Sequence, residues 1–173
     1  WDNLVPTMFE ATGSPEPGFR ESAFRVFAAQ PALVVQHLEQ ALPTFLSGFV
    51  DPDDSVRVAV SNAFVACFQS APKKQWSSFS PMLPGLLNAL PKYLEDGNED
   101  ALTSELESLI DLVTLAPKMF KPMLPTIIEF CSTITKNTDL ESPTRLAALE
   151  LLTTFCEASP NMCKQEASYA ENM

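Results

Sequence analysis

The stretch FSPMLP at residues 79–84 returns as FKPMLP at residues 120–125, which is 41 positions further along the chain. Counting back by the same distance leads to a Leu-Pro pair at residues 42–43, and a Val-Pro pair stands 37 positions before that, at residues 5–6. One proline therefore occupies an equivalent place in successive stretches of sequence. Periods of this length are typical of proteins built from stacked supersecondary repeats, each of which cannot bury its apolar face alone.

A second series of prolines marks the other end of each repeat. Its members are separated by 41, 45 and 43 residues and are Pro31, Pro72, Pro117 and Pro160. Arg57 and Arg145 each stand 15 residues before a proline of this series, which keeps their repeats in register. The two series together predict helical hairpins of about 37 to 45 residues.

The segments at residues 53–70, 98–116 and 141–158 place apolar residues every three or four positions, which is the period of an amphipathic helix. Acidic residues at the start of the first segment suit the positive end of a helix dipole. In the last segment, Ser142 is expected as the N-cap and Pro143 as the first helical residue. The expected apolar stripe of that segment is Leu146, Leu149, Leu152, Phe155 and Cys156.

The first half of each repeat carries an internal proline, at Pro43, Pro84 or Pro125. Because proline removes a backbone donor and clashes with the preceding turn, each of these helices is expected to bend there. No stretch alternates polar and apolar residues as a strand would. The sequence therefore predicts an all-α fold, an α-solenoid of antiparallel helix pairs. The expected helices lie near residues 1–12, 17–30, 33–49, 53–70, 76–95, 98–116, 119–136 and 141–158.

These helices predict about four repeats, which together cover residues 1–159. Residues 160–173 are expected to form a linker and the start of a truncated next repeat. The chain begins at Trp1 rather than Met, so we expect it to be an interior segment of a longer protein. The expected repeats are about 1–30, 31–71, 72–116 and 117–159.

The 173 residues include 11 basic and 22 acidic side chains, which gives a formal net charge of −11. An acidic chain lacks the basic stripe that a nucleic-acid backbone requires, so no direct nucleic-acid binding is expected. The same balance excludes a polybasic membrane-surface module, and no apolar run approaches the ~20 residues that span a bilayer. The charge instead permits a basic protein partner.

The residue patterns that usually carry catalysis are absent. His37 is the only histidine, and the sequence contains no glycine-rich phosphate loop and no zinc-ligand spacing. We therefore expect neither enzyme activity nor a metal or organic cofactor. No cysteine pair has the CxxC spacing, and Cys67, Cys131 and Cys156 lie in apolar runs. They are expected as buried free thiols, with a disulfide or metal role as the alternative.

Several of these features together resemble a known family. The pattern Asp-x-x-Val-Arg-x-Ala at residues 53–59, the period and the bent first helix resemble HEAT repeats. The FxPMLP starts, the Ala-Pro end at residues 116–117 and the opening at residues 1–27 are similar to the importin-β family of nuclear transport receptors, in particular its karyopherin β3 branch.

The resemblance implies a segment of a receptor that binds protein cargo and the Phe-Gly repeats of nuclear pore proteins. It also implies cargo release controlled by the GTP-bound form of the GTPase Ran, and shuttling between cytoplasm and nucleus. In the family the Ran contacts concentrate in other repeats, so Ran is expected to act through the full-length receptor. A non-transport HEAT scaffold that assembles protein complexes stays open as the alternative.

The second helices of HEAT repeats line the concave side of the solenoid, and their polar residues form the candidate partner-binding face. An acidic groove with amide and hydroxyl groups suits an extended basic peptide, because carboxylates pair with Lys and Arg. A solvated surface without a ligand is the alternative. The candidate residues are Asp54, Asn62, Ser104, Glu107, Ser108, Asp111, Glu150 and Glu157.

Arg57 and Arg145 are expected to form an inter-repeat ladder that fixes the stacking, as this arginine does in HEAT repeats, with cargo contact as the alternative. On the convex side the resemblance implies shallow pockets for Phe-Gly repeats between adjacent first helices. Aromatic and thioether groups of those helices are candidates either for such pockets or for the core: Phe45, Phe49, Phe79, Met82, Tyr93, Phe120 and Met123.

Overall fold

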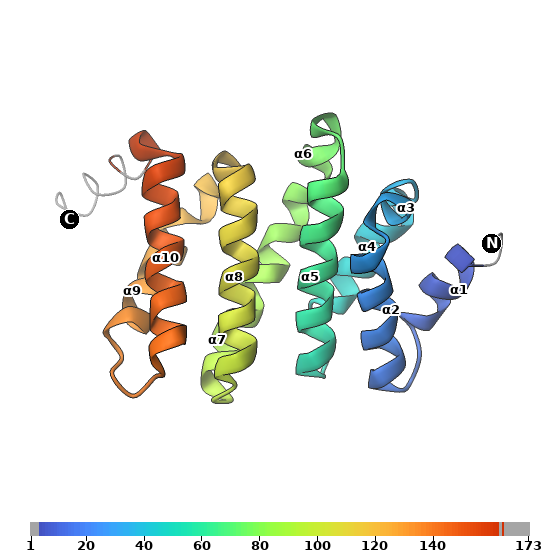
Figure 1. The fold of residues 1–173 in the computed structure, drawn as a ribbon, viewed down its shortest axis with the longest axis horizontal. Helices are drawn as coiled ribbons and strands as arrows, with labels where there is room; N and C mark the ends of the chain where they lie inside the picture. The colour runs from blue at the N-terminus through green and yellow to red at the C-terminus, as the bar shows by residue number, and fades with distance from the viewer. Residues whose placement is uncertain (1–3, 163, 165–173) are drawn as a thin grey trace. The chain divides into compact units, whose positions relative to one another are not determined.

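The computed structural model describes residues 4–162 and 164 of the chain. Every regular element within these residues is a helix, so the predicted all-α fold is confirmed (Figure 1). The chain divides into two units, Trp1–Asp96 and Gly97–Met173. No helix in the described part of the chain is long and apolar enough to cross a membrane.

The first unit contains two long helices that pack side by side, α2 (Pro17–Ala29) and α5 (Asp54–Ser70) (Figure 1). Shorter helices precede and connect them, and 3-10 turns at Lys73–Gln75 and Ser80–Met82 flank a single short helix. The remaining helices of the unit are α1 (Leu4–Ala11), α3 (Pro31–Val35), α4 (Leu38–Gly48), α6 (Trp76–Phe79) and α7 (Leu83–Glu95).

The second unit is built around α8 (Glu99–Leu115) and α10 (Ser142–Ala158), which lie side by side (Figure 1). A 3-10 segment at Pro117–Met123 leads into α9 (Leu124–Lys136), and α10 packs against both α8 and α9. The predicted start of a further repeat at 160–173 falls mostly outside the described residues; residues 160–162 are helical.

A chain of phenylalanine rings forms the core of the first unit. The ring centroids of Phe9 and Phe27 are 4.9 Å apart, and those of Phe27 and Phe45 are 6.3 Å apart. The rings of Phe45 and Phe64 follow at 5.6 Å, and those of Phe64 and Phe79 at 5.5 Å. All four contacts are edge-to-face, which is worth about 0.5–1.5 kcal/mol per pair beyond the buried area. The first-helix aromatic residues of this unit are therefore core residues and not pocket walls.

The first halves of the repeats are divided, but not always at the predicted proline. Helices α7 and α9 each begin one residue before Pro84 or Pro125, so the proline is the second helical residue, where its missing N–H is not needed. Helix α4 instead runs through Pro43, and the division falls at residues 36–37. The position of that break was therefore predicted wrongly. Pro43 removes only the bond to the carbonyl of Glu39, an exposed residue whose carbonyl water can reach.

Two of the second helices begin with a side-chain cap. Asp53 accepts hydrogen bonds from the N–H groups of Ser55 (3.0 Å) and Val56 (3.4 Å), as the acidic pattern predicted, and Asn98 accepts from the N–H of Ala101 at 3.2 Å at the start of α8. Ser142 is not the N-cap of α10: it is the first helical residue, and Glu141 occupies the cap position without a side-chain cap bond. The N–H of Glu141 instead donates to the carboxylate of Glu99 on α8.

The apolar stripe of α10 was predicted wrongly. Leu146 is 62% exposed and Leu149 is 47% exposed, and of the expected stripe only Phe155 is buried. The face that packs against α8 and α9 carries smaller side chains, which let the helices approach closely: Thr144, Ala147, Ala148 and Leu151.

The cysteines follow the same division between core and surface. Cys67 and Cys131 are buried free thiols, and burial raises the pKa of each to about 12. Cys156, which was predicted to be buried, is exposed because it lies off the packed face of α10. The two buried thiols therefore behave as small core residues.

Candidate partner-binding surfaces

A bidentate ion pair between Arg20 and Asp51 joins the start of α2 to the loop before α5. Arg20 donates from Nε to Asp51 Oδ2 at 2.7 Å and from Nη2 to Asp51 Oδ1 at 2.8 Å. The same guanidinium also donates to the carbonyl oxygens of Ser14 (2.9 Å) and Pro15 (3.1 Å). Burial alone would raise the pKa of Asp51, but the bonds from Arg20 and from the N–H of Asp53 outweigh it and lower that pKa. This pair therefore links two second helices of the first unit.

Arg57, one of the two predicted ladder residues, belongs to the first turn of α5 and is 3% exposed. It donates to the carbonyl of Asp51, just before α5, and to the carboxylate of Asp54, the first residue of α5, both within its own predicted repeat. Its guanidinium carbon also lies 5.0 Å from the ring centroid of Tyr93, which belongs to the next predicted repeat. Arg145 donates from Nε to the carbonyl of Thr135 at 3.2 Å, within its own predicted repeat. The ladder role of the two arginines stays a prediction.

The second unit links its long helices without an arginine. Glu99, the first residue of α8, accepts from the N–H of Glu141 at 2.9 Å and from the hydroxyl of Thr144 at 2.7 Å. The hydroxyl of Thr103 donates to that of Thr144 at 3.2 Å. One carboxylate of α8 thus holds the first turn of α10, a role that sequence reasoning missed because the partners are 42 and 45 residues apart.

Four of the predicted acidic residues lie exposed on neighbouring helices of the second unit. Glu107 and Asp111 are on α8, and Glu150 and Glu157 are on α10. Glu107 and Glu150 occupy the same position, the ninth residue of their helices. Ser104 is half-buried on α8. We call the surface formed by the four carboxylates the acidic face.

The other candidate residues do not join the acidic face. Ser108 is 5% exposed, so it is not available on the surface of α8. Asp54 is half-buried and accepts from Arg57. Asn62 is exposed, but it lies on α5 in the first unit. The acidic face is therefore narrower than the predicted groove.

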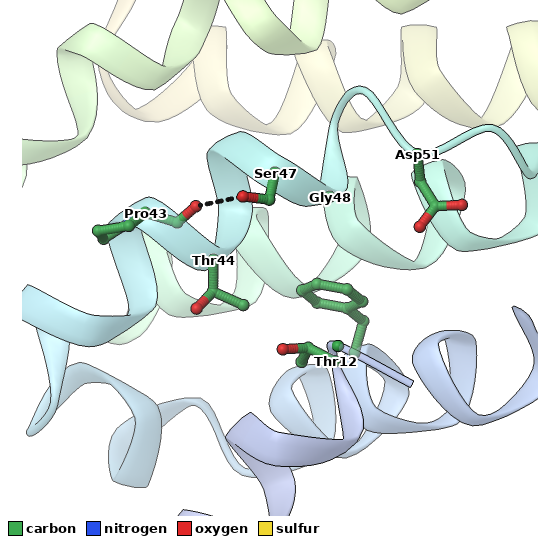
Figure 2. Close-up of a pocket in the computed structure, with 8 residues that line it drawn as sticks. Thr12, Pro43, Thr44, Ser47, Gly48 and Asp51 are labelled. Atoms are coloured by element: carbon green, nitrogen blue, oxygen red, sulfur yellow. Dashed lines mark hydrogen bonds between the residues drawn. The ribbon is translucent and has the colours of Figure 1, made fainter. Parts of the chain in front are cut away.

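A pocket of about 310 Å³ opens between α4 and the turn that follows α1, with α2 contributing one residue (Figure 2). Its aromatic and proline surface comes from Phe24 and Pro43. Thr12, Thr44 and Ser47 also line it, and the hydroxyl of each donates its proton to a backbone carbonyl, at 2.7, 2.9 and 3.2 Å respectively. Because the proton is used in this way, each hydroxyl oxygen can serve a ligand as an acceptor. The remaining lining residues are Gly13, Gly48 and Asp51.

The described residues hold no group of three or more His, Cys, Asp or Glu side chains that could bind a metal ion. The polar groups of the pocket and of the acidic face are hydroxyls and carboxylates. Such groups suit the binding of peptides and of basic side chains.

Two family models match the chain. One, described as IPO5-like, TPR repeats, matches residues 1–130, and the other, described as Importin repeat, matches residues 137–173. The repeat spacing of 41 to 45 residues exceeds the ~34 of a TPR repeat and fits the HEAT class of about 40–47.

Proteins and solved structures agree with the family models. Importin subunit beta-3 of Saccharomyces cerevisiae is 47% identical over 174 residues, which cover 100% of this chain and 16% of that protein. The Probable importin-5 homolog of Dictyostelium discoideum is 23% identical over 96% of this chain and 16% of its own length. Crystal structures of Kap121p bound to Nup53p and to Pho4p match with a TM-score of 0.89 at 47% identity, over 95% of this chain and 16% of theirs.

The chain thus spans about one sixth of the relatives that it matches, 16% in each case. The structural match covers nearly the whole chain, and the fold is the HEAT-repeat α-solenoid that the sequence predicted. The family model covers well over half of the chain, and the resemblance noted from its repeats is confirmed. The chain belongs to the importin-5-like family, in the karyopherin β3 branch of the importin-β proteins.

Proposed function

We propose that this chain is the cargo-binding segment of a nuclear transport receptor, and that the acidic face binds a basic segment of a protein cargo. The observation that carries the proposal is the exposure of four carboxylates on the adjacent helices α8 and α10. The similar protein Kap121p has been crystallised bound to Nup53p and to Pho4p, which supports a protein ligand. Under this proposal the segment comprises the four HEAT repeats that the sequence periods predict within residues 1–159.

The strength of such binding follows from the exposure of the carboxylates. An exposed ion pair contributes about 0.2–1 kcal/mol, so four pairs contribute about 1–4 kcal/mol. Charges of this kind raise the association rate and select basic partners, and salt weakens them. Most of the affinity must therefore come from additional apolar and backbone contacts with the cargo.

The experiment measures binding of a fluorescent lysine-rich peptide to the chain by anisotropy, with a lysine-to-alanine peptide as control. Exchanging Glu107 and Glu150 together for lysine should weaken binding at least about tenfold, because two attractions become repulsions. The matched control exchanges Glu129 on α9 and Asp139 in the connection after it together for lysine: it makes the same charge change on two exposed residues outside the acidic face and should reduce affinity far less. Equal losses from both variants would reduce the effect to net charge and contradict the proposed site.

We further propose that the pocket between α4 and the turn after α1 receives the phenylalanine of a Phe-Gly repeat. Phe24 of α2 and Pro43 of α4 line the pocket, and their apolar side chains suit contact with a ring. Its hydroxyl oxygens can accept from the backbone N–H groups of the repeat. Thr44→Trp should fill the pocket and abolish binding of a Phe-Gly peptide, whereas Thr114→Trp on the exposed part of α8 should not.

The whole receptor would carry cargo through the pore and release it to Ran-GTP, so the protein would be found in both cytoplasm and nucleus. Neither step requires an enzyme activity or a cofactor of this chain. If the chain is folded but binds neither lysine-rich nor Phe-Gly peptides, the non-transport HEAT scaffold becomes the better interpretation.

A further inference from the structure

The first turn of α10 carries a motif that the proposed receptor function does not use. Residues 142–145 read Ser-Pro-Thr-Arg, so proline follows the serine directly and a basic residue stands at the third position after it. Proline-directed serine kinases of the cyclin-dependent class recognise this arrangement, because their groove accepts a residue without a backbone N–H and an acidic subsite binds the later cation.

The chain contains four Ser-Pro pairs, and this one alone combines the basic residue with exposure. The third residue after Ser14 is proline, after Ser80 it is leucine and after Ser159 it is methionine. These three serines are half-buried, whereas Ser142 and both of its neighbours in sequence are exposed. The other pairs therefore serve as internal controls within the same molecule.

The position of Ser142 suits access by an enzyme. It is the first residue of α10 and follows a five-residue connection, 137–141, that contains no helix. The first N–H groups of a helix make no bonds within it, and helix ends open more readily than helix centres. The first intrahelical bond is the one from the N–H of Arg145 to the carbonyl of Glu141, at 3.2 Å.

A kinase would also have to release the side-chain bonds of this turn. Arg145 leaves the carbonyl of Thr135, Thr144 leaves Glu99 and Thr103, and the N–H of Glu141 leaves Glu99. The partners lie on α8 and α9, but every group released on the α10 side belongs to residues 141–145, so the rest of α10 can stay folded while the motif becomes extended. The opening is local.

From these observations we propose that Ser142 is a phosphorylation site for a proline-directed kinase that requires a basic residue at the third following position. In the transfer the Oγ of Ser142 bonds to the γ-phosphorus of ATP, the bond from that phosphorus to the bridging oxygen breaks, and ADP leaves. The hydroxyl proton passes to the catalytic base of the kinase.

The phosphate would act where α8 and α10 are joined. It carries a charge of about −1.5 to −2 at neutral pH. Glu99 contacts residues on both sides of Ser142, so this charge enters next to the Glu99 and Glu141 carboxylates. The modified serine would therefore compete with Glu99 for the N–H end of α10 and alter the link between the two helices of the acidic face. The site itself does not depend on whether that face binds cargo.

The test incubates the purified chain with a cyclin-dependent kinase and ATP and locates the phosphate by peptide mass spectrometry. We expect one phosphate, on Ser142, and none on Ser14, Ser80 or Ser159. Ser142→Ala should abolish it. Pro143→Ala should lower the initial rate about tenfold or more, and Arg145→Ala by a similar factor, the effect of losing one contact in the kinase groove.

Two comparisons separate recognition from folding. Arg145→Lys should restore most of the rate lost in Arg145→Ala, because lysine supplies the same charge. A synthetic peptide of residues 137–149 reports the motif without the helix. If the peptide is modified and the folded chain is not, α10 excludes the kinase and the proposal is overturned. Modification of Ser14, Ser80 or Ser159 at an equal rate, or of neither peptide nor chain, overturns it as well.

Discussion

Of the five glycines, Gly48, the last residue of α4, has the most closely packed side chains around it. A Cβ atom at this position would lie 2.5 Å from Val60 Cγ2 and 3.0 Å from the Cζ atom of Phe24. Both neighbours are buried, and neither can yield easily, because valine is stiff about χ1 and the ring is held within the aromatic core. We therefore predict that Gly48→Ala destabilises the protein by overpacking.

The magnitude follows from two opposing effects. Overpacking a core lowers the free energy of unfolding by about 1–3 kcal/mol, whereas replacing glycine by alanine in a helix interior raises it by at most about 1 kcal/mol. At the last residue of a helix this stabilisation is smaller, so the net loss of stability should be about 1–2 kcal/mol. For a chain of this size the loss lowers the midpoint of thermal unfolding by about 2–8 °C.

Circular dichroism during thermal and urea unfolding measures this loss, and Gly18→Ala provides the control. Gly18 lies in the first turn of α2, and a Cβ atom there would have no neighbour within 4 Å, so the same substitution should be neutral or slightly stabilising. Val60→Ala removes the clashing methyl groups, so the double variant should lose about 1–2 kcal/mol less than the sum of the single losses. Additive losses, or a Gly48→Ala protein as stable as the wild type, would refute the reasoning.

Three further predictions use other contacts of the described residues. Asp51→Asn should cost about 1.5–3 kcal/mol at neutral pH by weakening the pair with Arg20. Because the folded pKa of Asp51 lies below its ordinary 3.8, the stability that this carboxylate contributes should be full above that value and fall as the pH drops through the folded pKa; in urea titrations the acid slope of the variant should be shallower, with the part due to the lowered pKa of Asp53 retained. Gly97→Ala should cost about 1–2 kcal/mol in thermal unfolding, because Gly97 has φ +68 and alanine is strained there. Cys156 should react with a thiol reagent in the native protein, whereas Cys67, with a pKa of about 12, should react only on unfolding, which peptide mass spectrometry resolves.

Local patterns predicted most of the helices, since each depends on residues close in sequence. The proline spacing and the periodic apolar positions placed α2, α5, α8 and α10 to within a few residues of their observed bounds. The orientation of α10 about its axis could not be predicted in this way. Its leucines at 146 and 149 follow a helical period, but its alanines at 147 and 148 follow one too, and only the packing against α8 and α9 decides which face is buried.

The residues of the candidate site likewise fall into those that the local sequence pattern predicts and those that only the packing decides. Exposed carboxylates such as Glu107 and Glu150 could be predicted, because an acidic residue on a periodic helix usually lies opposite the apolar stripe. Ser108 was assigned to the surface, but small polar residues are accommodated in a helix interface as easily as outside it. The pocket between α4 and the turn after α1 could not be predicted from the sequence, since its lining residues come from segments that are separate in the chain.

Both units join successive second helices by side-chain bonds near the helix starts, but the bonded groups differ. In each, the first turn of one second helix is bonded to the start of the next: Arg20 to Asp51, in the loop before α5, and Glu99 to Glu141 and Thr144, at the start of α10. The first link is an ion pair between two charged groups, whereas the second joins a single charge to neutral donors. A new negative charge beside the first link would be drawn to Arg20, but beside the second it meets the carboxylates of Glu99 and Glu141. The link in the second unit is therefore the one that an added phosphate can loosen.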